Sequence, residues 1–342
     1  MMRIFFFTGF MFLSALSAYA QTAGEYNNQG LAALRCGHAS AAIVAFTKAI
    51  AIDHHNAQSY TDRALAFAES GRWTDAVSDA DHAIKLAPRL AVAYNNRATI
   101  EAAEGKAPDA LADLAMAIEL APRDTGCYNN RGIIYYKLGN FPAAISNYTK
   151  AIGIDPGYVP AYANRGKAYA KEGDLTAALT DYNKAIEIKP GDAFLYRNRG
   201  LIYIKSGDLT AARTDFSKAI GMDPKNTAAY FIRGTIYYKQ GDFTAAVADF
   251  SQAISLDPVD AKSYMNRGLT FLRINMPRQA IADLVKVTQL DQRFTRAYYN
   301  LAVAYYKLKQ YDKAWEYVHK AQRLGVTVKP AFMEALKSAA RK

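Results

Sequence analysis

The chain has 342 residues, a formal net charge of +11 at neutral pH and only two cysteines. Length alone suggests about two globular domains, and so few cysteines exclude a fold held by a disulfide framework. The basic charge suits acidic partners or anionic surfaces, although a soluble basic surface without such a partner is the simpler interpretation.

The first twenty residues have the pattern of an export signal. Arg3 gives a positive start, an apolar run follows over residues 4–16, and Ala18-Tyr19-Ala20 fits a small-residue cleavage site. A retained transmembrane anchor is the alternative, but the run is short for a membrane span and no charged stop follows it. Gln21 in place of cysteine argues against a lipoprotein anchor. We therefore expect cleavage, no transmembrane segment in the mature chain, and a periplasmic or secreted protein that does not meet nucleic acid.

From residue 23 onward the sequence repeats itself every 34 residues. The stretch AYANRGKAYAKEGDLTAALTDYNKAIEIKP at Ala161–Pro190 returns as LYRNRGLIYIKSGDLTAARTDFSKAIGMDP from Leu195, and again from Ala229. A fixed period of this length indicates a repeat array, in which each unit packs on its neighbours. Nine units fill residues 23–328 and a tail covers 329–342, so we expect no second globular domain. The units start at Ala23, Ala57, Ala91, Thr125, Val159, Ala193, Thr227, Ala261 and Thr295.

Each unit contains two helical patterns joined by a glycine. In the fifth unit, Tyr162, Gly166 and Tyr169 recur at spacings of four and three, as they do on one helix face. Position 15 is glycine in seven units and Asn275 or Lys309 in the last two. A residue with left-handed backbone conformation just past a helix ends it, and glycine adopts that conformation most easily, so we expect the first helix to end there. We expect the second helix to end before the proline at position 32 and to begin at a capping hydroxyl or carboxylate. The predicted caps are Ser40, Thr74, Thr176, Thr210, Thr244 and Asp312.

This pattern resembles the tetratricopeptide repeat family. The shared signature is an aromatic residue at position 4, Gly at 8, Tyr or Phe at 11, Ala at 20, an aromatic at 24, Ala at 27 and Pro at 32, and it recurs over residues 23–328. The outer units match less well, because Ala33 and Glu101 replace the aromatic at position 11. The resemblance implies an all-α solenoid, a right-handed superhelix of helix–turn–helix repeats. The tail, with Phe332 and Leu336 on one face, would form a C-terminal capping helix.

Arginine occupies position 7 in seven successive units, where the family usually has a core leucine. The same units carry aspartate at position 23, except that the fourth unit pairs Arg131 with Asn147. A guanidinium between helices needs a partner, so we expect an ion pair within each unit. An arginine ladder that faces an anionic ligand is the alternative. The predicted structural pairs are Arg63–Asp79, Arg97–Asp113, Arg165–Asp181, Arg199–Asp215, Arg233–Asp249 and Arg267–Asp283.

Asparagine recurs at position 6, where the resemblance implies a concave surface lined by the first helices. An amide can both donate to and accept from the backbone of an extended peptide. Support of helix packing is an equally good interpretation. The candidate peptide-binding asparagines are Asn28, Asn96, Asn130, Asn164, Asn198, Asn266 and Asn300.

Cations at position 13 give this surface a basic edge, which would suit an acidic partner. Favourable placement near a helix C-terminus also explains them. The candidate binding cations are Lys137, Lys171, Lys205, Lys239, Arg273 and Lys307. Aromatic and apolar residues at neighbouring positions, such as Phe194, Phe231 and Tyr299, concentrate in the C-terminal half. The family's carboxylate clamp needs Lys at position 5 and Asn at 9 in one unit, and no unit has both.

The sequence contains no recognisable catalytic constellation. The five histidines are scattered, Cys36 and Cys127 lie in different units, and no phosphate-binding loop is present. We expect both thiols to be buried and unpaired, and we expect no metal site and no cofactor.

These observations predict a non-enzymatic scaffold of the bacterial cell envelope that binds a protein or peptide in its groove. A basic surface that binds anionic envelope polymers is the second hypothesis, and an enzyme is the third. The sequence indicates neither the partner's identity nor an oligomeric state.

Overall fold

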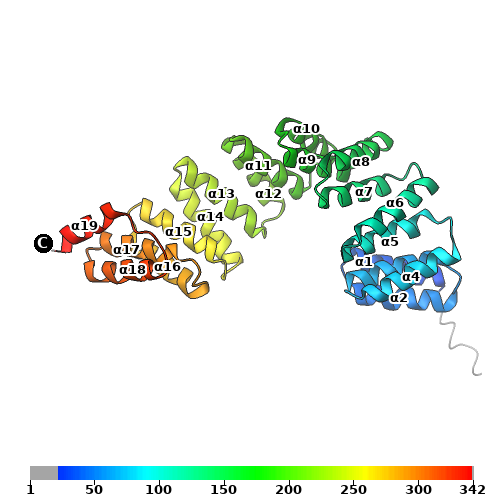
Figure 1. Cartoon of the computed structure of the whole chain (residues 1–342), viewed down its shortest axis with the longest axis horizontal. Coiled ribbons are helices and arrows are strands. Elements are labelled where there is room, and N and C mark those ends of the chain that lie inside the picture. Colours follow the sequence, from blue (N-terminus) through cyan, green and yellow to red (C-terminus); the bar gives the residue numbers. More distant parts are fainter. Residues whose placement is uncertain (1–21, 341–342) are drawn as a thin grey trace, which may run out of the picture. The chain divides into compact units, whose positions relative to one another are not determined.

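The computed structural model describes residues 22–340, which contain nineteen helices and no strand (Figure 1). The fold is therefore an all-α solenoid. Eighteen of the helices form nine successive pairs. The first helices of the pairs are α1 (Ala23–Arg35), α3 (Ala57–Glu69), α5 (Ala91–Glu104), α7 (Thr125–Lys137), α9 (Val159–Glu172), α11 (Ala193–Ser206), α13 (Thr227–Gln240), α15 (Ala261–Arg273) and α17 (Arg296–Lys307). The second helices are α2 (Ala39–Ile52), α4 (Trp73–Leu86), α6 (Ala107–Leu120), α8 (Phe141–Ile154), α10 (Leu175–Ile188), α12 (Leu209–Met222), α14 (Phe243–Leu256), α16 (Pro277–Leu290) and α18 (Tyr311–Arg323). The last helix is α19 (Pro330–Ala340).

The turn inside each pair has the backbone conformation that the sequence predicts. All seven glycines at position 15 have positive φ, from 73° to 95°, and Asn275 and Lys309 have φ of 57° and 59°. Glycine adopts this conformation without a steric penalty, so it ends the first helix and lets the chain reverse.

The second helices begin earlier than predicted. All six predicted caps lie inside their helices. Before Thr176, Thr210 and Thr244 the N-cap residue is the aspartate two positions earlier. Before Ser40, Thr74 and Asp312 the N-cap residues are His38, Arg72 and Gln310, which form no side-chain cap hydrogen bond. Asp174 accepts a hydrogen bond from the backbone N–H of Ala177 at 2.9 Å. A carboxylate reaches the free N–H groups of the first turn and complements the helix dipole, so it takes the capping role from the hydroxyl.

The core of each pair depends on small residues at the closest approach of the two helices. A Cβ built on Gly132 would lie 2.5 Å from the Tyr148 ring, which is 1% exposed. In the C-terminal part the contact is looser, because the corresponding atom on Gly268 would lie 3.2 Å from Leu284. Alanines such as Ala144 and Ala151 are fully buried in the second helix.

The chain divides into two compact parts, one ending at Asn164 and the other beginning at Arg165. In the second part, α19 packs on α18, and its Leu336 is completely buried with Val318 and Ala321. Cys127 is buried, but Cys36 is exposed because it is the C-cap residue of α1, so the prediction of two buried thiols is wrong for Cys36. None of the helices in residues 22–340 combines the length and apolar character that crossing a bilayer requires.

Candidate binding surface

The six predicted arginine–aspartate pairs are bidentate ion pairs inside their own repeats. In each pair the Nε–Oδ2 and Nη2–Oδ1 distances lie between 2.6 and 2.9 Å. The aspartate side chains are 3–11% exposed. The hydrogen bonds that Arg199 donates to the Asp215 carboxylate are the main reason that the pKa of Arg199 lies above its ordinary value. These arginines are therefore structural, because their carboxylate partners occupy the positions that an anionic ligand would need.

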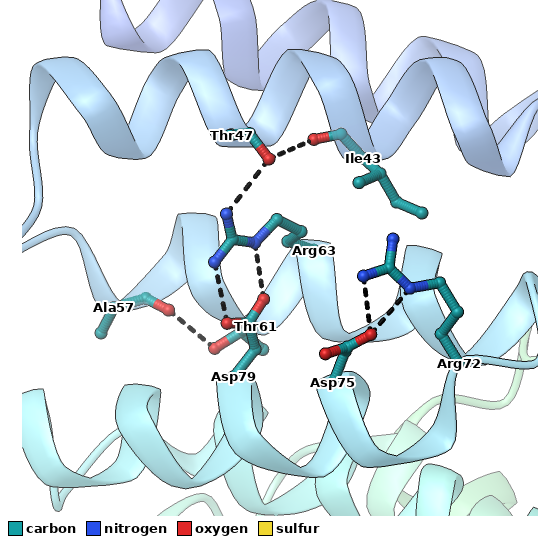
Figure 2. Close-up of polar contacts among 8 residues, drawn as sticks. All are labelled: Ile43, Thr47, Ala57, Thr61, Arg63, Arg72, Asp75 and Asp79. Atoms are coloured by element: carbon teal, nitrogen blue, oxygen red, sulfur yellow. Dashed lines mark hydrogen bonds and ion pairs between the residues drawn. The ribbon is translucent and has the colours of Figure 1, made fainter.

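Arginines of this series also contact the preceding repeat, as five of them show. Nη1 of Arg63 donates to Thr47 Oγ1 at 3.1 Å, and Thr47 in turn donates to the carbonyl of Ile43 (Figure 2). Arg97 reaches Asp81 in the same way at 2.7 Å. Sequence reasoning missed this contact, although polar residues recur at position 25 of the preceding unit. The other acceptors are Asn183, Ser217 and Ser251, to which Arg199, Arg233 and Arg267 respectively donate hydrogen bonds of 2.7–3.0 Å.

Arg131 has the weakest set of partners in the series. Its Nε donates to Asn147 Oδ1 at 2.7 Å, and the Asn147 amide donates to the carbonyl of Ala143. Position 25 of the preceding unit is Ala115, which offers no acceptor. Among the described residues Arg131 therefore forms no ion pair, and its guanidinium is held by one neutral amide and the face of Tyr128 at 5.5 Å.

In each of the two parts, we call positions 2, 5, 6, 9, 12 and 13 of the first helices the groove face of that part. Among residues 22–340, groove-face residues line the following three cavities. A cavity of about 110 Å³ lies between α5, α6 and α7 and includes Asn130 and Lys137. One of about 240 Å³ includes Lys239 and Asn266. The largest, about 730 Å³, includes Asn266 and Asn300. The structure thus brings predicted asparagines and cations of successive repeats to shared cavities.

The predicted asparagines are not equivalent. Asn130 donates its amide to Asn95 at 3.0 Å, and Asn164 donates to Asn129 at 2.9 Å. Asn198 donates to the carbonyl of Phe194 at 2.7 Å. The amide donors of these three asparagines are thus occupied by hydrogen bonds between or within repeats. This agrees with the interpretation that the asparagines at position 6 support helix packing.

The remaining asparagines differ in exposure. Asn96 is buried, so its side chain lies below the surface, and Asn28 is exposed. Asn266 and Asn300 are half-buried, and within residues 22–340 their side chains make no hydrogen bond. Their amides face a cavity with free donors and acceptors, which is the property a backbone-binding asparagine needs.

All six predicted cations at position 13 are exposed. Lys205 donates to the carbonyl of Ala170 at 2.7 Å, and Lys307 donates to Asn275 Oδ1 at 3.2 Å. The Arg273 guanidinium lies 5.9 Å from the Phe243 ring centre. Lys137, Lys171 and Lys239 form no ion pair with any described residue. The cations are thus available to an acidic ligand.

Two acidic groups in the N-terminal part have raised pKa values. Burial raises the pKa of Asp62, at groove position 6, to about 6, and a hydrogen bond from Gln58 partly opposes that shift. Burial, with the nearby Asp113 charge, raises the pKa of Glu101 to about 7. Oε2 of Glu101 is buried without a hydrogen-bond partner. In the part of the chain that the structure describes, no three His, Cys, Asp or Glu side chains are grouped to hold a metal.

The chain belongs to the tetratricopeptide repeat family. A family model described as tetratricopeptide repeat matches residues 61–125, 197–261 and 265–325, and a second, described as TPR repeat, matches 132–173 and 166–207. No curated protein matches the chain. The repeat fold is that of a protein-interaction scaffold, which typically has no catalytic activity.

Solved structures with similar folds include three that cover different shares of the chain. MamA is 26% identical over 47% of this chain and 94% of its own, with a TM-score of 0.46. A tetratricopeptide repeat protein from Parabacteroides merdae is 20% identical over 72% of this chain and 98% of its own, with a TM-score of 0.51. A monomeric mutant of IFIT1, solved with Gppp-AAAA, is 16% identical over 89% of this chain and 72% of its own, with a TM-score of 0.58. The last two likenesses concern the fold alone.

Proposed function

We propose that this protein is an exported, non-enzymatic scaffold of the bacterial envelope that binds an extended segment of a partner protein along its groove face. The observation that carries the proposal is the set of three cavities lined by groove residues of successive first helices. An extended peptide can contact repeated amides and cations in sequence, whereas a compact ligand would meet only one unit. The export step rests on the signal pattern of residues 1–20, which lie outside the described residues.

The experiment is site-specific photo-crosslinking on the mature protein in a bacterial envelope fraction. A photoreactive amino acid replaces Leu201 or Thr235 on the groove face, and Glu187 or Gln252 on the second helices as matched controls. We expect a discrete crosslinked partner from the groove positions alone, and competition by excess unlabelled protein. Equal crosslinking from the controls would place binding elsewhere. Cell fractionation with and without residues 1–20 tests the location.

Binding of anionic envelope polymers is the second candidate, because the groove face of the C-terminal part carries exposed cations without any acidic residue. Attraction between exposed charges is screened within about 10 Å at 0.1 M salt. A polymer complex held by charge should therefore weaken steeply between low and moderate salt. A partner crosslinked at Leu201 that persists at moderate salt would favour the peptide groove.

A further inference from the structure

The largest cavity lies at the C-terminal end of the groove face, between α15, α17 and the segment that leads into α19. Its volume is about 730 Å³, within the range of cavities that hold small ligands or short peptide segments. Met265, Leu269, Phe294, Tyr299 and Val326 give it an apolar lining. A large apolar side chain would lose contact with water there.

Three cations also line this cavity, and no acidic residue does. Arg293, Arg296 and Lys329 all belong to the lining, and all three side chains are exposed. Arg293 contacts Asp291 at 3.0 Å, whereas Arg296 and Lys329 form no ion pair among residues 22–340. Like charges brought together without a counter-charge repel one another, so a ligand with carboxylates would relieve that repulsion.

The last helix fixes one wall of the cavity. The Tyr299 ring packs edge-on against Phe332 of α19, with ring centres 5.7 Å apart, and Tyr306 packs against the same ring at 5.5 Å. Phe332 and Val326 join the cluster in which Leu336 is completely buried. The wall is therefore formed before a ligand arrives, and less ordering opposes binding.

An extended ligand fits this site better than a compact anion. Asn266 and Leu269 line both this cavity and the one of about 240 Å³, so the two cavities are neighbours. Asn266 and Asn300 offer unoccupied amides one repeat apart, which suits a peptide backbone.

We propose that this cavity binds an acidic peptide segment in which a large apolar side chain is flanked by carboxylates. The apolar side chain enters between Met265 and Tyr299, the carboxylates meet Arg296 and Lys329, and the backbone contacts Asn266 and Asn300. This inference rests on the proposed peptide-binding function and names the class of segment that the C-terminal end of the groove selects.

The test is fluorescence anisotropy with the mature protein and labelled ten-residue peptides that carry one phenylalanine among aspartates and glutamates. Two control peptides replace the phenylalanine by alanine or the acids by their amides. We expect each control peptide to bind about tenfold more weakly, since a well-buried anchor or a desolvated charge contributes more than 1 kcal/mol.

Protein variants then locate the site. Arg296→Gln with Lys329→Gln, and separately Tyr299→Ala, should each weaken binding about tenfold. Arg123→Gln with Lys225→Gln removes the same charge from exposed residues that line none of the three cavities, and should leave affinity unchanged. Circular dichroism checks that every variant stays folded.

Three outcomes would overturn the inference. The first is that the alanine peptide binds as tightly as the phenylalanine peptide. The second is that Arg123→Gln with Lys225→Gln loses as much affinity as Arg296→Gln with Lys329→Gln. The third is that a labelled oligonucleotide binds more tightly than the acidic peptide. Groove crosslinking from Leu201 that survives Arg296→Gln with Lys329→Gln would then separate failure at this cavity from failure of the proposed function.

Discussion

The groove face differs between the two parts of the chain, although both are built from the same repeat. Up to Asn164 two of its asparagines, Asn130 and Asn164, donate to an asparagine of the preceding repeat, it includes Asp62 and Glu69, and its cavity measures about 110 Å³. From α11 onward it is basic and aromatic, it has no acidic residue, and its cavities measure about 240 and 730 Å³. At this repeat position, Asn130 and Asn164 in the first part have a structural role, whereas Asn266 and Asn300 near the C-terminal end offer open polar groups.

The residue at position 5 of the preceding unit separates these four asparagines into the two roles. Asn95 and Asn129 occupy that position in the first part, and each accepts a hydrogen bond from the asparagine of the next repeat. Phe231 and Met265 occupy it before Asn266 and Asn300; the phenyl ring has no oxygen or nitrogen acceptor and the thioether sulfur is only a weak one. Polar ladders in repeat proteins thus need to be interpreted with the neighbouring unit in view.

The largest expected effect comes from breaking a buried ion pair in the second part. Asp181→Ala leaves the Arg165 guanidinium, which is 17% exposed, without its carboxylate. The loss should lower the free energy of unfolding by about 3–5 kcal/mol. Denaturant unfolding followed by circular dichroism measures it, with Asp174→Asn as a control that keeps the cap. A loss below about 1 kcal/mol would show that the pair behaves as a surface contact.

The helix contacts should also differ between the parts. Gly132→Ala forces a methyl group against Tyr148 and should cost about 2 kcal/mol of stability. Gly268→Ala meets Leu284 at a longer distance, so its cost should be about 1 kcal/mol or less. Paired thermal and denaturant unfolding compares them. Equal costs would contradict the looser packing of the C-terminal part.

The raised pKa of Asp62 predicts a pH dependence confined to the first part. The folded pKa is about 6 and the ordinary value 3.8, so the folded state holds the proton more tightly. The free energy of unfolding should therefore rise as the pH falls from about 6 to about 4. Asp62→Asn should be more stable than the parent at pH 7 by about 1–2 kcal/mol, and the difference should vanish near pH 4. A constant difference across this range would contradict the assignment.

Arg131 offers a smaller gain in the first part. Asn147→Asp should supply the carboxylate that the other six arginines have and raise the free energy of unfolding by about 1 kcal/mol. The measurement is denaturant unfolding, and Asn147→Ala serves as a control that loses the existing hydrogen bond. A neutral or destabilising Asn147→Asp would mean that this site lacks the geometry of the other pairs.

The smallest change tests the rule for position 5 directly. Met265→Asn should give Asn300 an acceptor and occupy its amide, and binding of the acidic peptide should weaken about threefold through the lost hydrogen bond. Met265→Leu keeps the apolar wall and controls for the loss of methionine. Unchanged affinity of Met265→Asn would contradict a role for the free Asn300 amide.

Local signals were sufficient to predict the helices and the turns between them. The period of 34 residues and the glycines at position 15 predicted the helix pairs, because those features act within one unit. The matched occurrence of Arg165 with Asp181 indicated contacts that the structure contains. The aspartate caps were missed because hydroxyl residues nearby offered a competing start.

Contacts between units were harder to predict. The hydrogen bonds from Arg63 to Thr47 and from Asn130 to Asn95 depend on the directions of side chains on both sides of a repeat boundary. A single unit's pattern does not contain that information. The largest cavity was also missed, since Arg293, Phe294 and Lys329 lie in segments outside the repeated helix faces.

The arginine that contacts two repeats also sets how cooperatively the array folds. In a linear array, stability is the sum of a term for each unit and a term for each junction, and a stronger junction makes neighbours fold together. Arg63, Arg97, Arg199, Arg233 and Arg267 each add to a junction. At Arg131 the corresponding residue, Ala115, offers no acceptor across the junction, and within the repeat Asn147 supplies an amide in place of a carboxylate. When the array is partly melted, the border between ordered and disordered repeats is expected to stop at that junction.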